Sequence, residues 1–189
     1  MKHLSTHNLY VALIHFPVMN RKGMPIGSAL TTIDMHDIAR ASKTFGVKGV
    51  YVVTPFTDQA ELAEQVIAHW TKGVGGELNP SRKEALELIR VAATFEEAVQ
   101  TIQNKEKQKV VTVATSAREL DNAIPIAALK EKLKSNAPHV LVFGTAWGMA
   151  DELIDTCDYK LEPIKGLGKY NHLSVRSAAS IYLDRITNG

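Results

Sequence analysis

Near-continuous apolar runs alternate along the chain with stretches in which apolar residues recur every three or four positions. Runs of the first kind are typical of strands that are covered on both faces of a sheet. The stronger predicted strands are 9–18, 49–54, 110–115 and 139–143, and the weaker ones are 29–33 and 159–164. Pro17 limits how far the first strand can continue in the middle of a sheet.

The second pattern predicts amphipathic helices in the intervals between these strands. The expected helices are 35–45, 58–70, 81–91, 95–104, 125–133, 149–156 and one that ends near 186. Capping signals precede several of them: Asp34 before the first, Thr94 with Glu97 as a capping box, and Asn171 before the last. Residues 72–80 are predicted to be a flexible break because Gly and Pro are concentrated there.

This alternation predicts a single α/β domain over 1–189, with a mainly parallel sheet and helices on both of its faces. Ligands of such sheets bind at the carboxyl ends of the strands. In the last third of the chain the predicted loops at that edge are 115–117, 144–148 and 164–171. Gly166 and Gly168 allow the backbone of the last loop to approach a ligand closely.

The composition changes this picture little, because 45% hydrophobic and 22% charged residues are usual for a folded globular protein. A net charge of +2 does not by itself indicate a nucleic-acid partner. The single cysteine, Cys157, excludes an internal disulfide and a thiolate cage and fits a reducing compartment. No apolar run approaches the ~20 residues of a membrane span, and residues 1–8 lack the order of a signal peptide. We therefore expect a cytoplasmic protein with no membrane partner.

Common catalytic motifs are missing. The sequence contains no GxxxxGK(S/T) phosphate loop, no GxGxxG after the first strand and no GxSxG nucleophile turn. Asp34, His36 and Asp37 have the side-chain types of metal ligands, but carboxylates at a helix start also interact with the helix dipole, so we predict no metal site. His15 is expected in the core, and Trp147 either in the core or in the wall of a pocket for a flat ring.

Residues 34–47 resemble the first motif of the SPOUT class of S-adenosylmethionine (SAM)-dependent RNA methyltransferases. That motif has an Asn, an Arg six residues later and a Gly six residues beyond the Arg. Arg40 and Gly46 keep this spacing here, and Asp34 takes the place of the Asn.

Two later segments resemble the second and third motifs of the same class. Leu141–Thr145 followed by Gly148 is similar to the second, and Ile164–Gly166 together with 173–178 resembles the third. Order and spacing agree over about 9–186, so the resemblance covers nearly the whole chain. The most similar group is a compact bacterial one related to the guanine-N1 tRNA methyltransferases.

The resemblance implies a trefoil knot at the C-terminal end and a SAM molecule held there by main-chain groups of the three loops. It also implies a homodimer that acts on structured RNA, either tRNA or rRNA. The cofactor-binding positions carried over to this sequence are Thr115, Ser116, Phe143, Gly144, Thr145, Ala146, Gly148, Ile164, Gly166, Leu167, Gly168, Asn171 and Leu173.

Arg40, Asp34 and Asp37 are the candidate catalytic residues. Methyl transfer requires an aligned nucleophile and removal of its proton as charge develops. An arginine could lower the pKa of a substrate group or hold a phosphate, and either carboxylate, or the nearby His36, could accept the proton. The second motif lacks the glutamate of the ribose-methylating enzymes, and Asp34 replaces their Asn, so the choice between base and ribose methylation stays open.

Two other interpretations remain. The chain could be a knotted protein that binds RNA or nucleotides without transferase activity, which the missing glutamate keeps open. It could also be an unrelated flavodoxin-like α/β protein, which an unknotted C-terminal end would favour.

Overall fold

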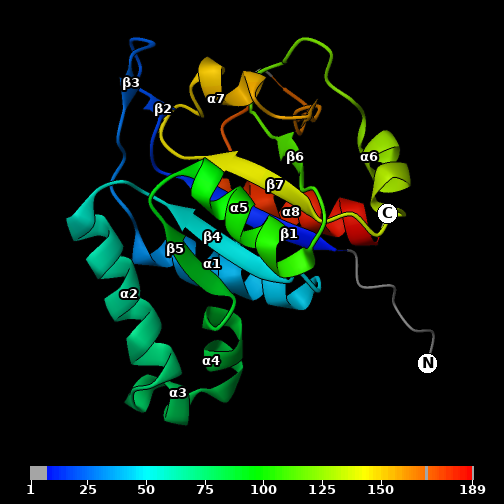
Figure 1. The fold of residues 1–189 in the computed structure, drawn as a ribbon. Helices are drawn as coiled ribbons and strands as arrows, with labels where there is room; N and C mark the ends of the chain where they lie inside the picture. Colours follow the sequence, from blue (N-terminus) through cyan, green and yellow to red (C-terminus); the bar gives the residue numbers. More distant parts are fainter. Residues whose placement is uncertain (1–7, 169, 189) are drawn as a thin grey trace.

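A computed structural model describes residues 8–168 and 170–188 of the chain. Its centre is a parallel sheet in the order β5-β4-β1-β7-β6-β8 (Figure 1). The strands of this sheet are β1 Leu9–Ile14, β4 Gly49–Val53, β5 Ile89–Ala92, β6 Val111–Ala114, β7 His139–Gly144 and β8 Tyr159–Lys160. A separate antiparallel pair is formed by β2 Val18–Met19 and β3 Pro25–Ile26.

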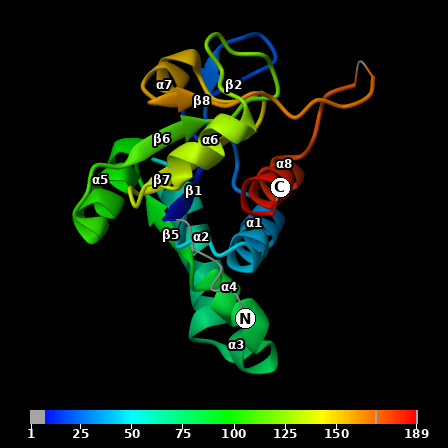
Figure 2. The same ribbon diagram turned by 90° about the vertical axis from the view of Figure 1, so that its right-hand side faces the viewer.

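Helices cover both faces of the sheet, as the sequence predicts. They are α1 Thr32–Thr44, α2 Thr57–Thr71, α3 Val74–Leu78, α4 Pro80–Leu86, α5 Phe95–Glu106, α6 Ile126–Leu133, α7 Asp151–Asp155 and α8 Val175–Thr187. Figure 2 shows α1 and α8 on one side of the sheet and α5 on the other. The predicted α/β fold with a mainly parallel sheet is therefore confirmed.

The alternation of side chains along β1 explains how one strand supports two cores. Leu9, Val11 and Leu13 belong to the core that includes α1 and α8, whereas Tyr10 and Ala12 belong to the core that includes α5 and α7. Successive side chains of a strand point to opposite faces, so an all-apolar run such as 9–14 is stable only when both faces are covered. All six residues of β1 are buried.

Several predicted boundaries are wrong. Residues 32–33 begin α1 rather than ending a strand, because Thr31, and not Asp34, occupies the N-cap position. The first strand ends at Ile14 instead of continuing to 18, and the predicted strand 159–164 has only two residues in the sheet. The capping box before α5 is confirmed, because Thr94 Oγ1 accepts a bond from Glu97 N and Glu97 Oε2 accepts one from Ala93 N.

The region between α2 and α5 differs most from the prediction. Residues 74–78 form the short helix α3 inside the expected break. The expected helix 81–91 ends at Leu86, and the chain then forms β5, in which Val91 pairs with Val52 of β4. β5 lies at the edge of the sheet, and its four residues are buried, exposed, half-buried and buried in turn. A segment this short and without strict alternation cannot be separated from a helical turn by pattern alone.

The chain around β8 has hydrogen-bonded neighbours on both sides. On one side, Leu161 N donates to Ala114 O of β6 at 2.8 Å. On the other side, Ile124 N donates to Lys160 O at 2.8 Å, and Glu162 N donates to Ile124 O at 3.0 Å. Ile124 lies in the connection that leads from β6 through α6 to β7. The chain beyond β8 then reaches α8, which packs against α1 and α6.

Candidate functional site

Loops that follow three neighbouring strands come together at the carboxyl edge of the sheet. The loop after β6 is joined to the segment before α8 by Asn171, whose Nδ2 donates to Ala117 O at 2.8 Å. The loop after β7 is joined to the same segment by Trp147, whose ring centroid lies 6.1 Å from that of His172. Asn171 therefore connects loops and does not cap α8, because the cap is Ser174, whose hydroxyl accepts a bond from Ser177 N.

The loop after β7 is a tight turn with a fixed conformation. A Cβ atom on Gly144 would lie 2.5 Å from the backbone nitrogen of Met149, so this position cannot carry a side chain without moving the turn. Ala146 and Gly148 both have positive φ angles, of 50° and 101°. Gly148 N donates to Thr145 O at 2.9 Å and closes the turn. The requirement for glycine at 144 thus comes from the turn itself.

Thr145 connects this turn to the end of β1. Its hydroxyl donates to Ile14 O at 2.9 Å and lies 2.5 Å from the hydroxyl of Ser28. Ser28 Oγ lies in turn 3.1 Å from Nδ1 of His15, which is 1% exposed, as expected for a core residue. Burial lowers the pKa of His15 and outweighs the opposing hydrogen bond with Ser28 and the charge of Asp34. The neutral ring of His15 is thus linked through the Ser28 hydroxyl to Thr145 in the loop after β7.

The other predicted cofactor positions divide into buried and exposed ones. Thr115, Phe143 and Ile164 are buried, and the Thr115 hydroxyl donates to Val142 O at 2.8 Å. Leu167 and Leu173 are exposed large apolar residues, as are Trp147 and Tyr170 of the same loops. An exposed apolar group of this size, gathered on loops at the carboxyl edge, is characteristic of an interaction site.

The segment between β8 and α8 runs away from the sheet and returns to it (Figure 2). In its described part, 163–168 and 170–173, no main-chain group makes a hydrogen bond to another main-chain group. A Cβ atom on Gly168 would meet nothing within 4 Å, and one on Gly166 would meet only Tyr170 O at 3.4 Å. This backbone is therefore open for contacts with a bound molecule.

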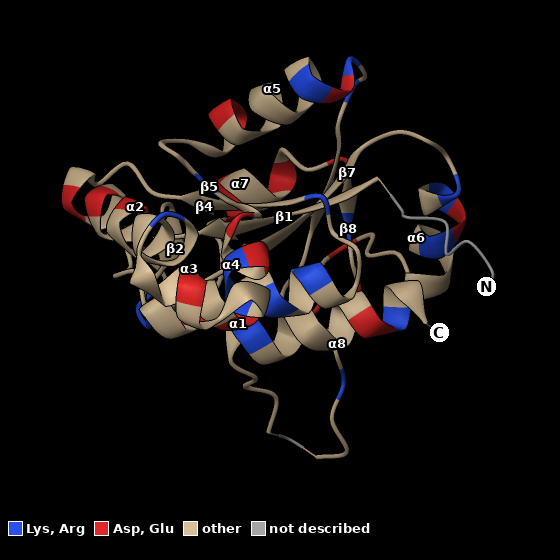
Figure 3. Cartoon of the chain, turned by 90° about the horizontal axis from the view of Figure 1, so that it is seen from below, with Lys and Arg blue, Asp and Glu red and all other residues tan. Residues whose placement is uncertain are grey.

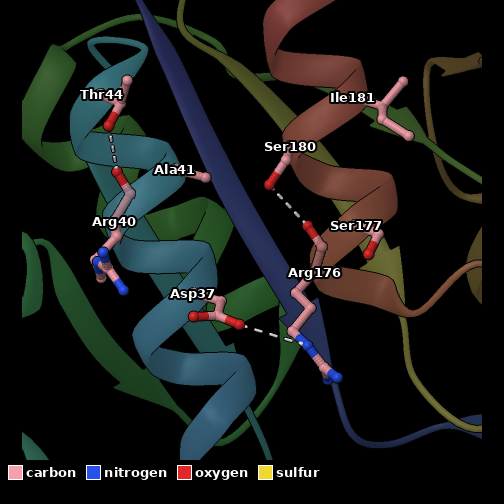
Figure 4. A pocket seen from close by; sticks show the side chains of 8 residues that line it. All are labelled: Asp37, Arg40, Ala41, Thr44, Arg176, Ser177, Ser180 and Ile181. Carbon is pink, nitrogen blue, oxygen red and sulfur yellow. Dashed lines mark hydrogen bonds and ion pairs between the residues drawn. The ribbon is translucent and has the colours of Figure 1, made fainter.

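The candidate catalytic residues lie on α1, beside a groove between α1 and α8. Figure 4 shows this groove, which has a volume of about 510 Å³. Arg176 of α8 donates from its Nη1 to Asp34 Oδ1 at 2.8 Å, and its Nε lies 3.5 Å from Asp37 Oδ2. Asp34 also accepts a bond from the Thr31 hydroxyl at 2.6 Å. Both carboxylate oxygens of Asp34 therefore accept a hydrogen bond.

Arg40 differs from this pair because its guanidinium makes no ion pair with the described residues. Its side chain is exposed and extends from α1 apart from the Asp37–Arg176 contact, as Figure 4 shows. The groove around it is otherwise lined by small or uncharged side chains: Ala41, Thr44, Ser177, Ser180 and Ile181.

Comparison with known proteins assigns the chain to a family. Residues 8–188 match the family model described as SAM-dependent RNA methyltransferase. The chain belongs to this family. A tRNA (guanine-N(1)-)-methyltransferase of Oleidesulfovibrio alaskensis is 43% identical over 95% of this chain but only 42% of its own length, so the chain spans less than half of that relative. An uncharacterized protein of Aquifex aeolicus is 37% identical over 95% of this chain and 88% of its own length.

A solved structure with the same fold comes from the SpoU methyltransferases. The AviRb enzyme of Streptomyces viridochromogenes, in complex with the cofactor AdoMet, superposes on 95% of this chain and 58% of its own with a TM-score of 0.58 at 14% identity. The SPOUT resemblance read from the sequence motifs is thereby confirmed at the level of family and fold.

Sequence reasoning missed several residues that shape the site of this methyltransferase-family chain. Arg176 lies within the third-motif match and was a candidate phosphate contact, but no local pattern shows that it is the partner of both candidate carboxylates. Ser28 and Thr145 form a hydroxyl pair between segments 117 residues apart, which no local pattern announces.

His36, a candidate base, is packed against the neighbouring helices. Its ring meets Trp70 of α2 edge-on at 5.4 Å, and the Arg82 guanidinium of α4 lies 4.7 Å from the same Trp70 ring. Burial, followed by the charge of Arg82, lowers the pKa of His36, so its ring is neutral at physiological pH. The cluster holds α2 and α4 against α1.

Other classes of site find no support in the described parts of the chain. Within 8–168 and 170–188, no group of three or more His, Cys, Asp or Glu side chains is arranged to hold a metal ion. Burial raises the pKa of the Cys157 thiol to about 11, so this residue is a poor nucleophile. Within the same ranges no helix has the length and apolar character needed to cross a bilayer.

Proposed function

We propose that this protein transfers a methyl group from SAM to structured RNA, with the cofactor held by the loops after β6, β7 and β8. The observation that carries the proposal is the junction of these loops at the carboxyl edge, beside main chain that forms no backbone hydrogen bonds in its described part, 163–168 and 170–173. Membership of the SAM-dependent RNA methyltransferase family supports the same cofactor and substrate class.

The residues at the junction fit a nucleoside cofactor. An adenine ring requires apolar walls and main-chain hydrogen bonds, and Leu167, Leu173 and Trp147 offer exposed apolar surface beside unpaired backbone groups. Gly166 and Gly168 leave space in which a ligand could contact the backbone. When bound, SAM supplies an electrophilic methyl group. We assign the cofactor contacts to the positions named from the sequence, with Asn171 fixing the spacing of the loops through Ala117.

We assign the catalytic step to residues of α1. Arg40 is exposed and has no carboxylate partner among the described residues, so its planar guanidinium can hold an RNA phosphate or stabilise the deprotonated form of the accepting group. Asp37 is the more accessible of the two carboxylates, with 41% of its side chain exposed compared with 12% for Asp34. We therefore propose Asp37 as the proton acceptor and Asp34 as the residue that positions Arg176.

Transfer RNA is the first substrate to test. The Oleidesulfovibrio relative is named for guanine-N1 methylation of tRNA, and it is 43% identical over 179 residues. The identity and the family support tRNA over other structured RNAs, and we propose a guanine base as the acceptor.

We propose that the C-terminal segment is knotted. Residues 160–162 pass between β6 and Ile124, which are two parts of one continuous connection from β6 through α6 to β7. A chain that passes between two parts of a closed loop and continues to a helix on the far side threads that loop.

Optical-tweezers stretching from both termini should then give a final length shorter than ~3.6 Å per residue, because a tightened knot retains chain. Stretching from Leu9 to Ala150, before the threading segment, should give the full length. Equal values per residue in both experiments would rule out the knot.

We also propose a homodimer formed at the groove between α1 and α8, with Arg40 at the edge of the interface and accessible to RNA. Small side chains such as Ala41 and Ser180 line it, and they allow another helix to approach closely. Sedimentation should show a dimer that Ser180→Arg converts to a monomer, whereas a matched change outside the groove, Ser135→Arg, should leave it intact. A monomeric native protein would contradict this assignment.

We propose that this protein is a single domain and that it lies in the cytoplasm. The support for the cytoplasm is its single cysteine, which fits a reducing compartment.

The decisive experiment is calorimetric titration with SAM and S-adenosylhomocysteine, with ATP and FMN as controls, followed by transfer of labelled methyl groups to tRNA and rRNA. Binding of the first pair alone, with label in RNA, is the expected result. Binding without incorporation would favour a knotted RNA- or nucleotide-binding protein. No binding by the folded protein would overturn the proposed function.

A further inference from the structure

A second hollow lies far along the sheet from the loops, near the amino ends of β1, β4 and β5 and under α5. It has a volume of about 300 Å³, at the lower end of the range for small-molecule sites. Tyr10 of β1 and Tyr51 of β4 form part of its wall, with ring centroids 6.4 Å apart. The hollow therefore combines aromatic surface with a size suited to a small metabolite.

Tyr51 brings an unpaired hydroxyl to this hollow. The residue is 5% exposed, yet its hydroxyl makes no hydrogen bond with the residues that the structure describes. Tyr10 provides the contrast, because its hydroxyl donates to Glu106 Oε1 at 2.5 Å. The Tyr51 oxygen is not among the buried side-chain atoms that lack a partner in the described chain, so solvent reaches it and it can donate to a ligand in the hollow.

The charge around the hollow is positive. Lys48, Arg90 and Lys105 line it, and none of the described residues that line it is acidic. Glu106, whose carboxylate accepts a bond from the Tyr10 hydroxyl, is bonded to Lys48 at 3.2 Å. Neither Arg90 nor Lys105 makes an ion pair with any described residue. Figure 3 shows basic segments at the C-terminal end of α5, where Lys105 lies.

The Arg90 side chain is fixed by hydrogen bonds to main-chain oxygens, although it has no ion-pair partner among the described residues. Its Nη1 donates to Glu87 O at 2.7 Å and to Ile89 O at 2.6 Å, which leaves the other guanidinium N–H groups available. Lys105 Nζ lies 5.5 Å from the centre of the Tyr10 ring. A fixed guanidinium, a lysine and a phenolic donor around one hollow match the oxygens of a phosphate group.

We propose that this hollow binds a small phosphomonoester, of the size of a sugar phosphate, independently of the SAM loops. Arg90 and Lys105 hold the phosphate oxygens, Tyr51 donates its hydroxyl to one of them, and the aromatic wall covers the organic part. The site is separate from the proposed methyl-transfer site because it lies at the amino ends of strands whose carboxyl ends lead toward those loops.

The test is a two-dimensional amide NMR titration of the full chain with ribose 5-phosphate and with ribose at equal ionic strength. We expect saturable shifts at the amides of Gly49, Tyr51 and Val91 with ribose 5-phosphate and none with ribose. Absence of shifts at these amides, equal shifts with ribose, or shifts confined to the loops at 144–148 and 164–173 would each overturn the proposal. SAM binding is read separately in the same samples, so failure of one site does not decide the other.

Matched variants test the contacts. Tyr51→Phe removes only the hydroxyl, which bonds nothing else in the described chain, so the fold is kept while binding weakens about tenfold. Lys105→Gln removes one charge and should weaken binding by a similar factor. Lys72→Gln, an exposed lysine at the end of α2, is the control and should leave the affinity unchanged. Unchanged affinity in both Tyr51→Phe and Lys105→Gln would overturn the site.

Discussion

Arg176 at the start of α8 and Asp34 in the first turn of α1 form an ion pair at 2.8 Å, although 142 residues separate them in the sequence. The contact joins the two helices that border the groove beside Arg40. Asp34 is largely buried, with 12% of its side chain exposed, so the pair is protected from solvent on that side. Asp34, which takes the place of the first-motif Asn and was a candidate catalytic residue, thus joins α1 to α8.

Replacement of this arginine should lower stability. In Arg176→Ala, Asp34 keeps only the Thr31 hydroxyl as a partner, and we expect a loss of about 1–3 kcal/mol in the free energy of unfolding. Urea unfolding followed by circular dichroism measures it. Arg185→Ala, on the exposed side of the same helix, should change the value by less than about 0.5 kcal/mol. Equal values for both variants would show that the pair adds nothing to stability.

Two glycines of the predicted cofactor loops should respond differently to valine. Gly144→Val places a Cβ 2.5 Å from Met149 N, so the turn must shift and the thermal midpoint should fall by several degrees. Gly166→Val meets only Tyr170 O at 3.4 Å, so the fold is kept while SAM loses the space it needs.

Thermal melting and SAM calorimetry together check this contrast. Gly166→Val should melt like the native protein and bind SAM at least tenfold more weakly, about 1.4 kcal/mol. Native affinity in this variant would refute the assignment of Gly166 to the cofactor site.

We expect Arg40→Ala to weaken methyl transfer or RNA binding without changing the stability of the fold. Because the Arg40 side chain has no carboxylate partner in the described chain, its loss should leave stability and SAM affinity unchanged. Methyl transfer or RNA affinity should fall by about tenfold or more, as for loss of a charged hydrogen bond. Filter binding and methyl incorporation measure these effects. Lys43→Ala, on the same helix and in a surface ion pair with Glu84, is the matched control. A native phenotype in Arg40→Ala would leave Arg40 without a role in the reaction.

Stability should fall as the pH is lowered below neutrality. The folded-state pKa of His15 is lowered, mainly by burial, so the unfolded chain binds a proton that the native state excludes. Stability from this source is therefore present above the ordinary pKa near 6.5 and is lost as the pH falls toward the folded-state value, with a slope of at most about 1.4 kcal/mol per pH unit. The lowered pKa of His36 acts in the same direction.

Unfolding free energies measured between about pH 7.5 and 5.5 check this slope. A His172→Gln variant should keep it, because that ring lies on the exposed loop. A stability that does not change over this range would contradict a neutral, buried His15.

The sequence determined the parts of this protein that depend on short-range pattern. The apolar runs 9–18, of which only 9–14 forms β1, and 139–143 predicted a sheet covered on both faces, and Thr94 with Glu97 fixed the start of α5 through bonds between near neighbours. The order and spacing of three motifs were sufficient to name the family that the model match over residues 8–188 then showed.

Only the tertiary structure decided which distant groups meet. The four residues of β5 gain their stability from pairing with β4, so propensity within 81–91 could not separate them from a helix. The same holds for Asp34 with Arg176 and for Ser28 with Thr145, whose partners are more than a hundred residues away. Local sequence sets the preferences of each segment, whereas long-range packing and hydrogen bonding choose between them, because the free energy of those contacts exists only once the chain has folded.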